Sequence, residues 1–190
     1  MSIHRPWQHW ISLGVITQGL IFGNIPVSLS QDFPYPPNST FFTGQPPSFQ
    51  GASAPYRGVY VPNVPYYFTV DLPTNAIESL GKIAIKPQVS PSTITFILSQ
   101  TKAFFGTTDQ RGEAIALQAT TQDPNTGDIL IQFAQPVSPG NTVTVGIIAA
   151  QNPAIEGVYQ FTVKAFPAGQ EAIAMTLGVG RIQIYGISRF

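Results

Sequence analysis

The sequence predicts an all-β protein, an antiparallel, Ig-like β-sandwich of about eight short strands with an irregular Pro- and aromatic-rich segment before it. From residue 62 onward, apolar and polar residues alternate in short segments rich in Val, Ile, Thr, Tyr and Phe, as is typical of half-buried strands. Turn-forming Gly, Pro, Asn and Asp separate these segments. The 17 Gly and 18 Pro residues also suit short strands and tight turns better than helices.

The first 30 residues have the pattern of a secretory signal peptide. Arg5 supplies a positive charge, residues 11–23 are mostly apolar, and small residues stand at Ser28 and Ser30. These are the three parts of a leader that is cleaved, here between Ser30 and Gln31. The alternatives are an uncleaved anchor or a buried helix, but the apolar stretch is shorter than the roughly 20 residues of a membrane span. We therefore expect no stable transmembrane span after cleavage.

Residues 31–58 interleave Pro with aromatic residues and are expected to form an irregular strap. Pro fixes φ and removes a backbone donor, so no helix or central strand is expected here. Phe41, Phe42, Phe49 and Tyr56 are candidate contacts for a partner. The alternative is that these rings lie on the following domain, because a fully exposed aromatic patch is costly.

The β-sandwich domain is expected to occupy residues 59–190. Its polar Thr and Gln side chains, such as Thr144, would face solvent. Only residues 75–81 (NAIESLG) suggest a helical turn, and residues 171–176 suggest a loop. The predicted strands cover residues 65–73, 82–86, 93–98, 115–121, 129–135, 142–148, 158–166 and 181–186.

The composition excludes several classes of function. The 9 Lys and Arg residues balance the 9 Asp and Glu residues and are scattered along the chain, whereas nucleic-acid binding needs clustered cations. The chain has no Cys, and His4 and His9 would leave with the leader. A mature chain without His or Cys cannot form a Ser-His-Asp triad, a Cys nucleophile or a zinc-thiolate site. No catalytic residue and no cofactor are predicted.

Two polar motifs have a chemical and a structural interpretation. Asp123, Asn125 and Asp128 are weak candidates for calcium ligands, because they offer oxygen atoms at close spacing. The alternative is a β-turn between two strands, for which Asp, Pro, Asn and Gly are well suited. Residues 99–102 match the S-x-x-K pattern, but they follow a strand rather than opening a helix. Residues 109–113, with their three charges, indicate a solvated loop.

Five segments together resemble an exported cyanobacterial family of unknown function, domain of unknown function 2808. The resemblance runs from about Pro46 to Tyr185 and implies an exported, mainly β, single-domain protein without assigned catalytic residues. Residues 171–176 depart from the family pattern. The segments are VPNVPYYFTVDLPTNA, TKAFFGT, PVSPGNTVTV, NPAIEGVYQFTVKAFPAG and LGVGRIQIY.

These observations predict a non-catalytic, exported protein of the cell envelope, located in the periplasm, at the cell surface or in the thylakoid lumen. Its role would be that of a binding or structural module for a partner protein or a glycan. The loops around Asn125 and Asn152 are further candidate contacts. The alternative function is a carboxylate-based extracytoplasmic hydrolase, in which calcium assists.

Overall fold

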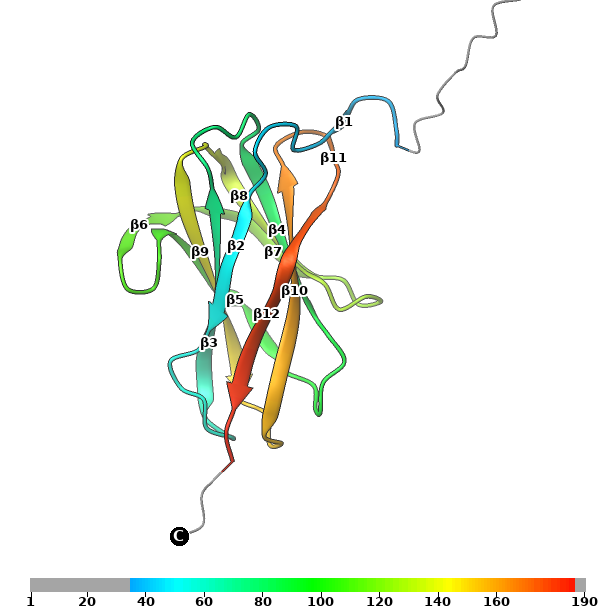
Figure 1. Ribbon diagram of the computed structural model, residues 1–190. Helices are drawn as coiled ribbons and strands as arrows, with labels where there is room; N and C mark the ends of the chain where they lie inside the picture. Colours follow the sequence, from blue (N-terminus) through cyan, green and yellow to red (C-terminus); the bar gives the residue numbers. More distant parts are fainter. Residues whose placement is uncertain (1–34, 187–190) are drawn as a thin grey trace, which may run out of the picture. The chain divides into compact units, whose positions relative to one another are not determined.

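The computed structural model describes residues 35–186, and the predicted signal peptide lies outside these residues. The described chain forms strands β1 to β12 and contains no helix. Ten of the strands form two five-stranded sheets, and β1 (Ser39–Thr40) and β11 (Glu171–Ala172) form a small parallel pair. Figure 1 shows the two sheets packed face to face. This arrangement confirms the predicted antiparallel sandwich.

Each sheet is antiparallel throughout, and strands from distant parts of the sequence are neighbours in it. The first sheet has the order β2 (Ser48–Ser53), β3 (Pro62–Leu72), β9 (Asn141–Gln151), β5 (Phe96–Gly106) and β6 (Arg111–Ile115). The second has the order β12 (Met175–Ile184), β10 (Gly157–Pro167), β4 (Leu80–Pro87), β8 (Ile129–Val137) and β7 (Leu117–Gln122).

The period of two residues in the sequence places one face of each central strand in the core. In β10, Tyr159, Phe161 and Val163 are buried, whereas the residues between them are only partly buried. The same alternation holds in β3, where Tyr66 and Phe68 point inward. Apolar burial of this kind is the main favourable contribution to folding, at about 25 cal/mol per Å².

Four aromatic rings form the centre of the core. Phe161 packs edge-to-face against Tyr66, Phe68 and Phe96, with ring centroids 5.9, 5.3 and 6.3 Å away. Edge-to-face packing is favoured because the positive ring edge meets the negative face of its neighbour. Since Phe161 contacts rings from β3 and β5, it joins the two sheets.

Asn152 ties the strand ends together at one end of the core. Its Oδ1 accepts a hydrogen bond of 2.9 Å from the Tyr66 hydroxyl. Its Nδ2 donates to the carbonyl oxygens of Tyr56 and Gly58 at 3.0 and 2.7 Å. Asn152 is only 2% exposed, so it holds the segment before β3, whereas residues 154–156 of the same loop are exposed. Burial also raises the pKa of Tyr66.

Edge strands close one side of the sandwich, where β2 and β12 lie side by side (Figure 1). A Cβ placed at Gly180 of β12 would lie 2.7 Å from Cβ of Ala52 and 3.1 Å from the Phe49 ring. The two edges therefore approach as closely as a glycine allows.

Three local expectations are wrong. Residues 75–79 form a turn and bends, and residues 80–81 already belong to β4, so no helix forms there. Residues 171–176, expected as a loop, contain β11 and the start of β12. The strap expected to be irregular contains the regular strand β2, which pairs with β3 through a register shift between Phe49 and Gly51. As an edge strand, β2 accommodates this irregularity because only one of its sides is bonded.

Candidate functional site

The four aromatic residues predicted as partner contacts fall into two groups. Phe42 and Phe49 pack against the hydrophobic core, in line with the alternative in which the strap lies on the domain. Phe41 is 36% exposed and Tyr56 is 64% exposed. Phe41 stacks edge-to-face on Tyr35, with centroids 5.0 Å apart. Phe41 and Tyr56 thus stay accessible to a partner.

The candidate calcium residues lie in the turn between β7 and β8. The Asp123 carboxylate accepts hydrogen bonds from the backbone N–H groups of Asn125 and Thr126, at 2.7 and 3.2 Å. These bonds hold the pKa of Asp123 below its usual value. Asp128 Oδ1 lies 3.4 Å from the ammonium group of Lys86, its ion-pair partner, and has no hydrogen-bond partner among the described residues. The carboxylates thus have structural partners, as the β-turn interpretation expects.

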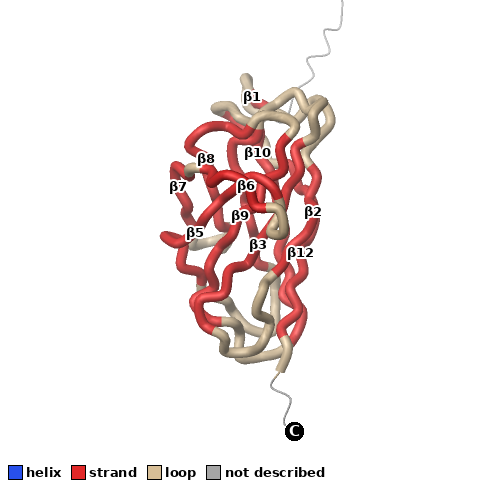
Figure 2. Tube along the Cα trace, turned by 90° about the vertical axis from the view of Figure 1, so that its left-hand side faces the viewer, coloured by secondary structure: helices blue, strands red, loops and turns tan. Residues whose placement is uncertain are grey.

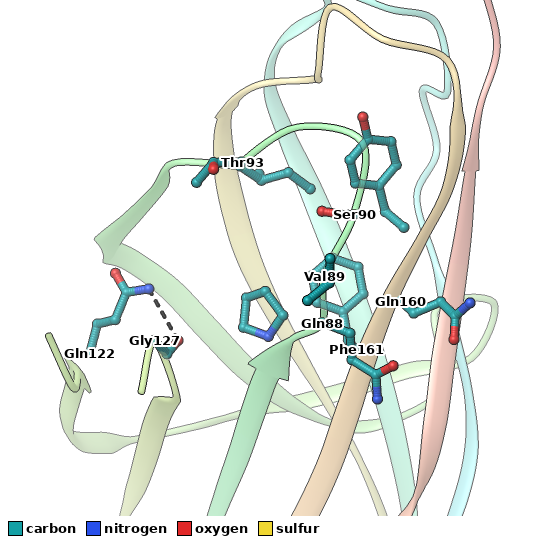
Figure 3. A pocket seen from close by; sticks show the side chains of 11 residues that line it. Gln88, Val89, Ser90, Thr93, Gln122, Gly127, Gln160 and Phe161 are labelled. Atoms are coloured by element: carbon teal, nitrogen blue, oxygen red, sulfur yellow. Dashed lines mark hydrogen bonds between the residues drawn. The ribbon is translucent and has the colours of Figure 1, made fainter. Parts of the chain in front are cut away.

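A hollow of about 430 Å³ opens between the segment after β4 and the turn that follows β7. Figure 3 shows Gln122 and Gly127 on one wall, joined by a hydrogen bond of 3.2 Å, and Gln88 on the opposite side. The Gln88 amide already donates to Thr162 at 2.6 Å. No charged residue lines this hollow among the residues that the structure describes, so it offers few groups for specific recognition.

A larger groove, of about 780 Å³, lies on the outer face of the first sheet. We call it the outer-face groove; it is lined by residues of β3, β9, β5 and β6 and by Leu117 of β7. Three paired residues cross the floor of the groove. Gly146 of β9 lies between Tyr67 of β3 and Lys102 of β5. The glycine leaves a gap between two large side chains.

Tyr67 leans over the glycine in this row. A Cβ at position 146 would lie 2.8 Å from Cε1 of the Tyr67 ring and 3.0 Å from its Cδ1. Contacts under 3.0 Å require something to move, so any larger residue at position 146 would displace the ring. Gly146 therefore sets both the depth of the groove and the position of Tyr67.

The hairpin of β5 and β6 forms one wall of the groove, and Figure 2 shows it from the side on which β6 lies. Gly106, with φ at 86°, allows the turn, since a Cβ there would lie 2.1 Å from the Gln110 carbonyl oxygen. The hairpin covers Thr144, which donates a hydrogen bond of 2.6 Å to the Gly106 carbonyl. Thr144 is buried, so the prediction that it faces solvent is wrong.

Arg111 of β6 is held over two rings in the groove. Its Cζ atom lies 4.3 Å from the centre of the Phe104 ring and 5.8 Å from that of Tyr67. Its Nη2 donates to the Tyr67 hydroxyl at 3.2 Å. Cation–π contacts of this kind orient a guanidinium and leave its other N–H groups available.

The groove has a net positive charge, because its described lining includes cations and no anions. Lys102 and Arg111 both line it, and none of the lining residues within the described range is acidic. The only ion pair among residues 35–186 is the one between Lys86 and Asp128. In a chain of formal net charge zero, this local excess of cations is distinctive.

A large bulge in β5 forms the polar part of the wall. The register of β5 against β9 shifts between Ile97 and Lys102, so the residues between them project from the ladder. Ser99, Gln100 and Thr101 line the groove there, and the buried hydroxyl of Thr101 has no partner among the described residues. Because residues 99–102 are strand and not a helical turn, the S-x-x-K match does not bring Ser99 and Lys102 onto one helical face.

Sequence reasoning missed this groove, because Arg111 was assigned to a solvated loop. Residues 111–115 have no clear period of two, because Glu113 and Ile115 share one set of alternate positions; only the preceding Gly-containing turn pointed to a hairpin. No group of three or more His, Cys, Asp or Glu residues that could hold a metal occurs within residues 35–186. The same residues contain no helix with the length and hydropathy of a membrane span.

A family model described as "Protein of unknown function (DUF2808)" matches residues 39–184, most of the chain. The chain belongs to the DUF2808 family. The match covers both sheets and the outer-face groove of this DUF2808 domain. No curated protein matches the chain.

Solved structures similar to the DUF2808 domain include domains of surface adhesins, a fimbrial subunit and AvmM, which catalyses macrocyclization in alchivemycin A biosynthesis. The collagen-binding subdomain of the Enterococcus faecalis surface protein ACE is 10% identical, with a TM-score of 0.45 over 73% of this chain and 98% of that one. The collagen-binding domain of a Staphylococcus aureus adhesin is 12% identical, with a TM-score of 0.36 over 65% and 88%. Self-complemented MyfA from Yersinia enterocolitica Myf fimbriae is 13% identical, with a TM-score of 0.37 over 74% and 98%. Similarity at this level carries no argument about binding.

Proposed function

We propose that this DUF2808 protein is an exported, non-catalytic binding module of the cell envelope, which holds a partner protein or a glycan in the outer-face groove. The observation that carries the proposal is the arrangement of Arg111 over Phe104 and Tyr67. A guanidinium that is already oriented loses little conformational freedom when a ligand binds. The groove also combines polar and charged groups with apolar side chains in its lining, as ligand sites do.

Two features of the sequence support the rest of the proposal. The N-terminal pattern of a leader supports export to the periplasm, the cell surface or the thylakoid lumen. Once residues 1–30 are removed, the chain has no His and no Cys, the residues that most often serve as acid–base groups and nucleophiles. A role in binding is therefore favoured over catalysis.

Site-specific photo-crosslinking in cells tests the proposal. A photoreactive amino acid replaces Gln100, which is exposed and lines the groove, or Gln135, which is exposed on β8 of the other sheet. We expect an adduct from the Gln100 variant that disappears when Arg111→Gln is added, and none from the Gln135 variant. Equal adducts from both positions, or an adduct that Arg111→Gln leaves unchanged, would contradict the proposal.

A further inference from the structure

The chemistry of the outer-face groove identifies the ligand class. We propose that the groove binds an acidic glycan, a polysaccharide whose sugars carry carboxylate groups, with Arg111 and Lys102 holding the carboxylates and Tyr67 and Gln100 contacting the sugar rings. This inference rests on the proposed function, because it names the ligand of the same groove.

The charged residues of the groove indicate that its ligand is negatively charged. Arg111 and Lys102 line the groove, and no Asp or Glu accompanies them among the described lining residues. Arg111 is held by rings and by the Tyr67 hydroxyl, not by a carboxylate. The planar guanidinium can therefore receive a ligand carboxylate through two parallel N–H donors, a geometry for which Arg is favoured over Lys.

The two cations lie in the same groove, on neighbouring strands. Lys102 and Phe104 are two residues apart on β5, so their side chains share the outer face about 7 Å apart. Arg111 lies over Phe104 and also donates to the Tyr67 hydroxyl, and Lys102 stands in the row of Gly146 and Tyr67. Two cations therefore line one groove, where the carboxylates of a ligand can contact both.

The neutral groups in the groove match sugar rings. Ser99, Gln100 and Thr101 provide hydroxyl and amide groups along one wall, and the Thr101 hydroxyl is buried without a partner among the described residues. Ser99 and Gln100 are exposed, so their polar groups are the ones that a ligand hydroxyl can reach. Tyr67, Pro65 and Ile148 form the apolar part of the lining, against which the C–H face of a sugar ring can pack.

A glycan fits this site better than an acidic peptide does. Extended peptides often bind sheets by pairing with an exposed edge strand. The floor of the groove is the face of β9, whose two sides are already paired with β3 and β5. The backbone of the floor therefore has no free edge to offer, so recognition there must come from side chains; of the strands of this sheet that line the groove, only β6, at its wall, has an unpaired side.

Calorimetry on the purified full chain tests the inference with a defined probe. The probe is a short oligomer of galacturonic acid, and its matched control is the same oligomer with each carboxylate reduced to an alcohol. We expect saturable binding of the acidic oligomer, weakened by added salt, and at least about tenfold weaker binding of the reduced one, which corresponds to about 1.4 kcal/mol. A poly-glutamate peptide serves as the alternative ligand.

Variants connect the binding to the groove. Arg111→Gln is expected to weaken binding about tenfold, and Arg111→Lys less, because Lys keeps the charge but loses the paired donors. Arg181→Gln, at an exposed arginine on β12 of the other sheet, is expected to bind as the unchanged protein does. Circular dichroism of each variant shows whether it is folded.

Each outcome separates this inference from the proposed function. Equal binding of the acidic and reduced oligomers, tighter binding of poly-glutamate, or no binding at millimolar oligomer would overturn the acidic-glycan inference. In these cases an Arg111-dependent adduct at Gln100 would still support the groove as a binding site. Binding of the acidic oligomer that Arg111→Gln leaves unchanged would place the glycan elsewhere and also overturn the inference.

Discussion

Asn152→Ala is expected to destabilise the fold by about 3–5 kcal/mol, although the side chain has no part in the aromatic core. The substitution removes three hydrogen bonds, one from the Tyr66 hydroxyl and two to the carbonyl oxygens of Tyr56 and Gly58. Leaving the fully buried Tyr66 hydroxyl without an acceptor costs about 1–3 kcal/mol. The two carbonyls belong to less buried residues, so each adds about 1 kcal/mol, the net value of an ordinary hydrogen bond.

Urea denaturation followed by circular dichroism measures this loss, with the slope against urea checked for constancy. A double-mutant cycle with Tyr66→Phe separates the buried bond from the rest. The double variant should be less destabilised than the sum of the two single variants by about 1 kcal/mol, because both remove the same interaction. A loss below about 1 kcal/mol for Asn152→Ala, the scale of a surface substitution, would refute this account of the residue.

Three further outcomes follow from the core, the acidic groups and the turn after β7. Phe161→Ala should cost about 3–5 kcal/mol in urea denaturation, as for other buried aromatics; a loss below about 1 kcal/mol would contradict its place between the sheets. Hydrogen bonds from Thr43 hold the pKa of Glu78 below its usual value. Its stabilisation is therefore complete above the unfolded-state pKa of about 4.3 and is lost as the pH falls through the lower folded-state pKa. Glu78→Gln should make stability less dependent on pH in that range, and an unchanged acid profile would refute this. Because Asp123 and Asp128 already have partners, calcium calorimetry should give no saturable heat; heat that Asp128→Ala abolishes would favour the calcium interpretation.

The sequence predicted the strands that have a clean period of two. The alternation of Tyr159, Phe161 and Val163 with polar residues was sufficient to identify β10 and its buried face, because one face of a central strand must be apolar. Strand β2 was missed because the neighbouring Pro residues and the shift at Gly51 interrupt its pattern. The local composition around β2 favours an irregular segment, but hydrogen bonding to β3 makes it a strand.

The groove depends on contacts that local patterns do not contain. Thr144 has the spacing of an outward residue, yet the β5–β6 hairpin covers it. In the sequence, Arg111 is only a charged residue near a turn. Its position over Phe104 and Tyr67 becomes visible in the fold. The sequence does not reveal that Gly146 lies between Tyr67 and Lys102, because the order of the strands in the sheet decides which residues are neighbours. The helical turn expected at residues 75–81 does not form, because a segment this short, with Asn75, Ser79 and Gly81 of low helix propensity, cannot nucleate a helix on its own.

The contact between β2 and β12 has a consequence for how the protein reaches its folded state. These strands come from the beginning and the end of the described chain, and they meet along one flank through Gly180, Ala52 and Phe49. A nascent chain that lacks its last residues has nothing to cover that flank, so its apolar interior stays open to water. Folding must wait until synthesis, and any transport across a membrane, has delivered nearly the whole polypeptide.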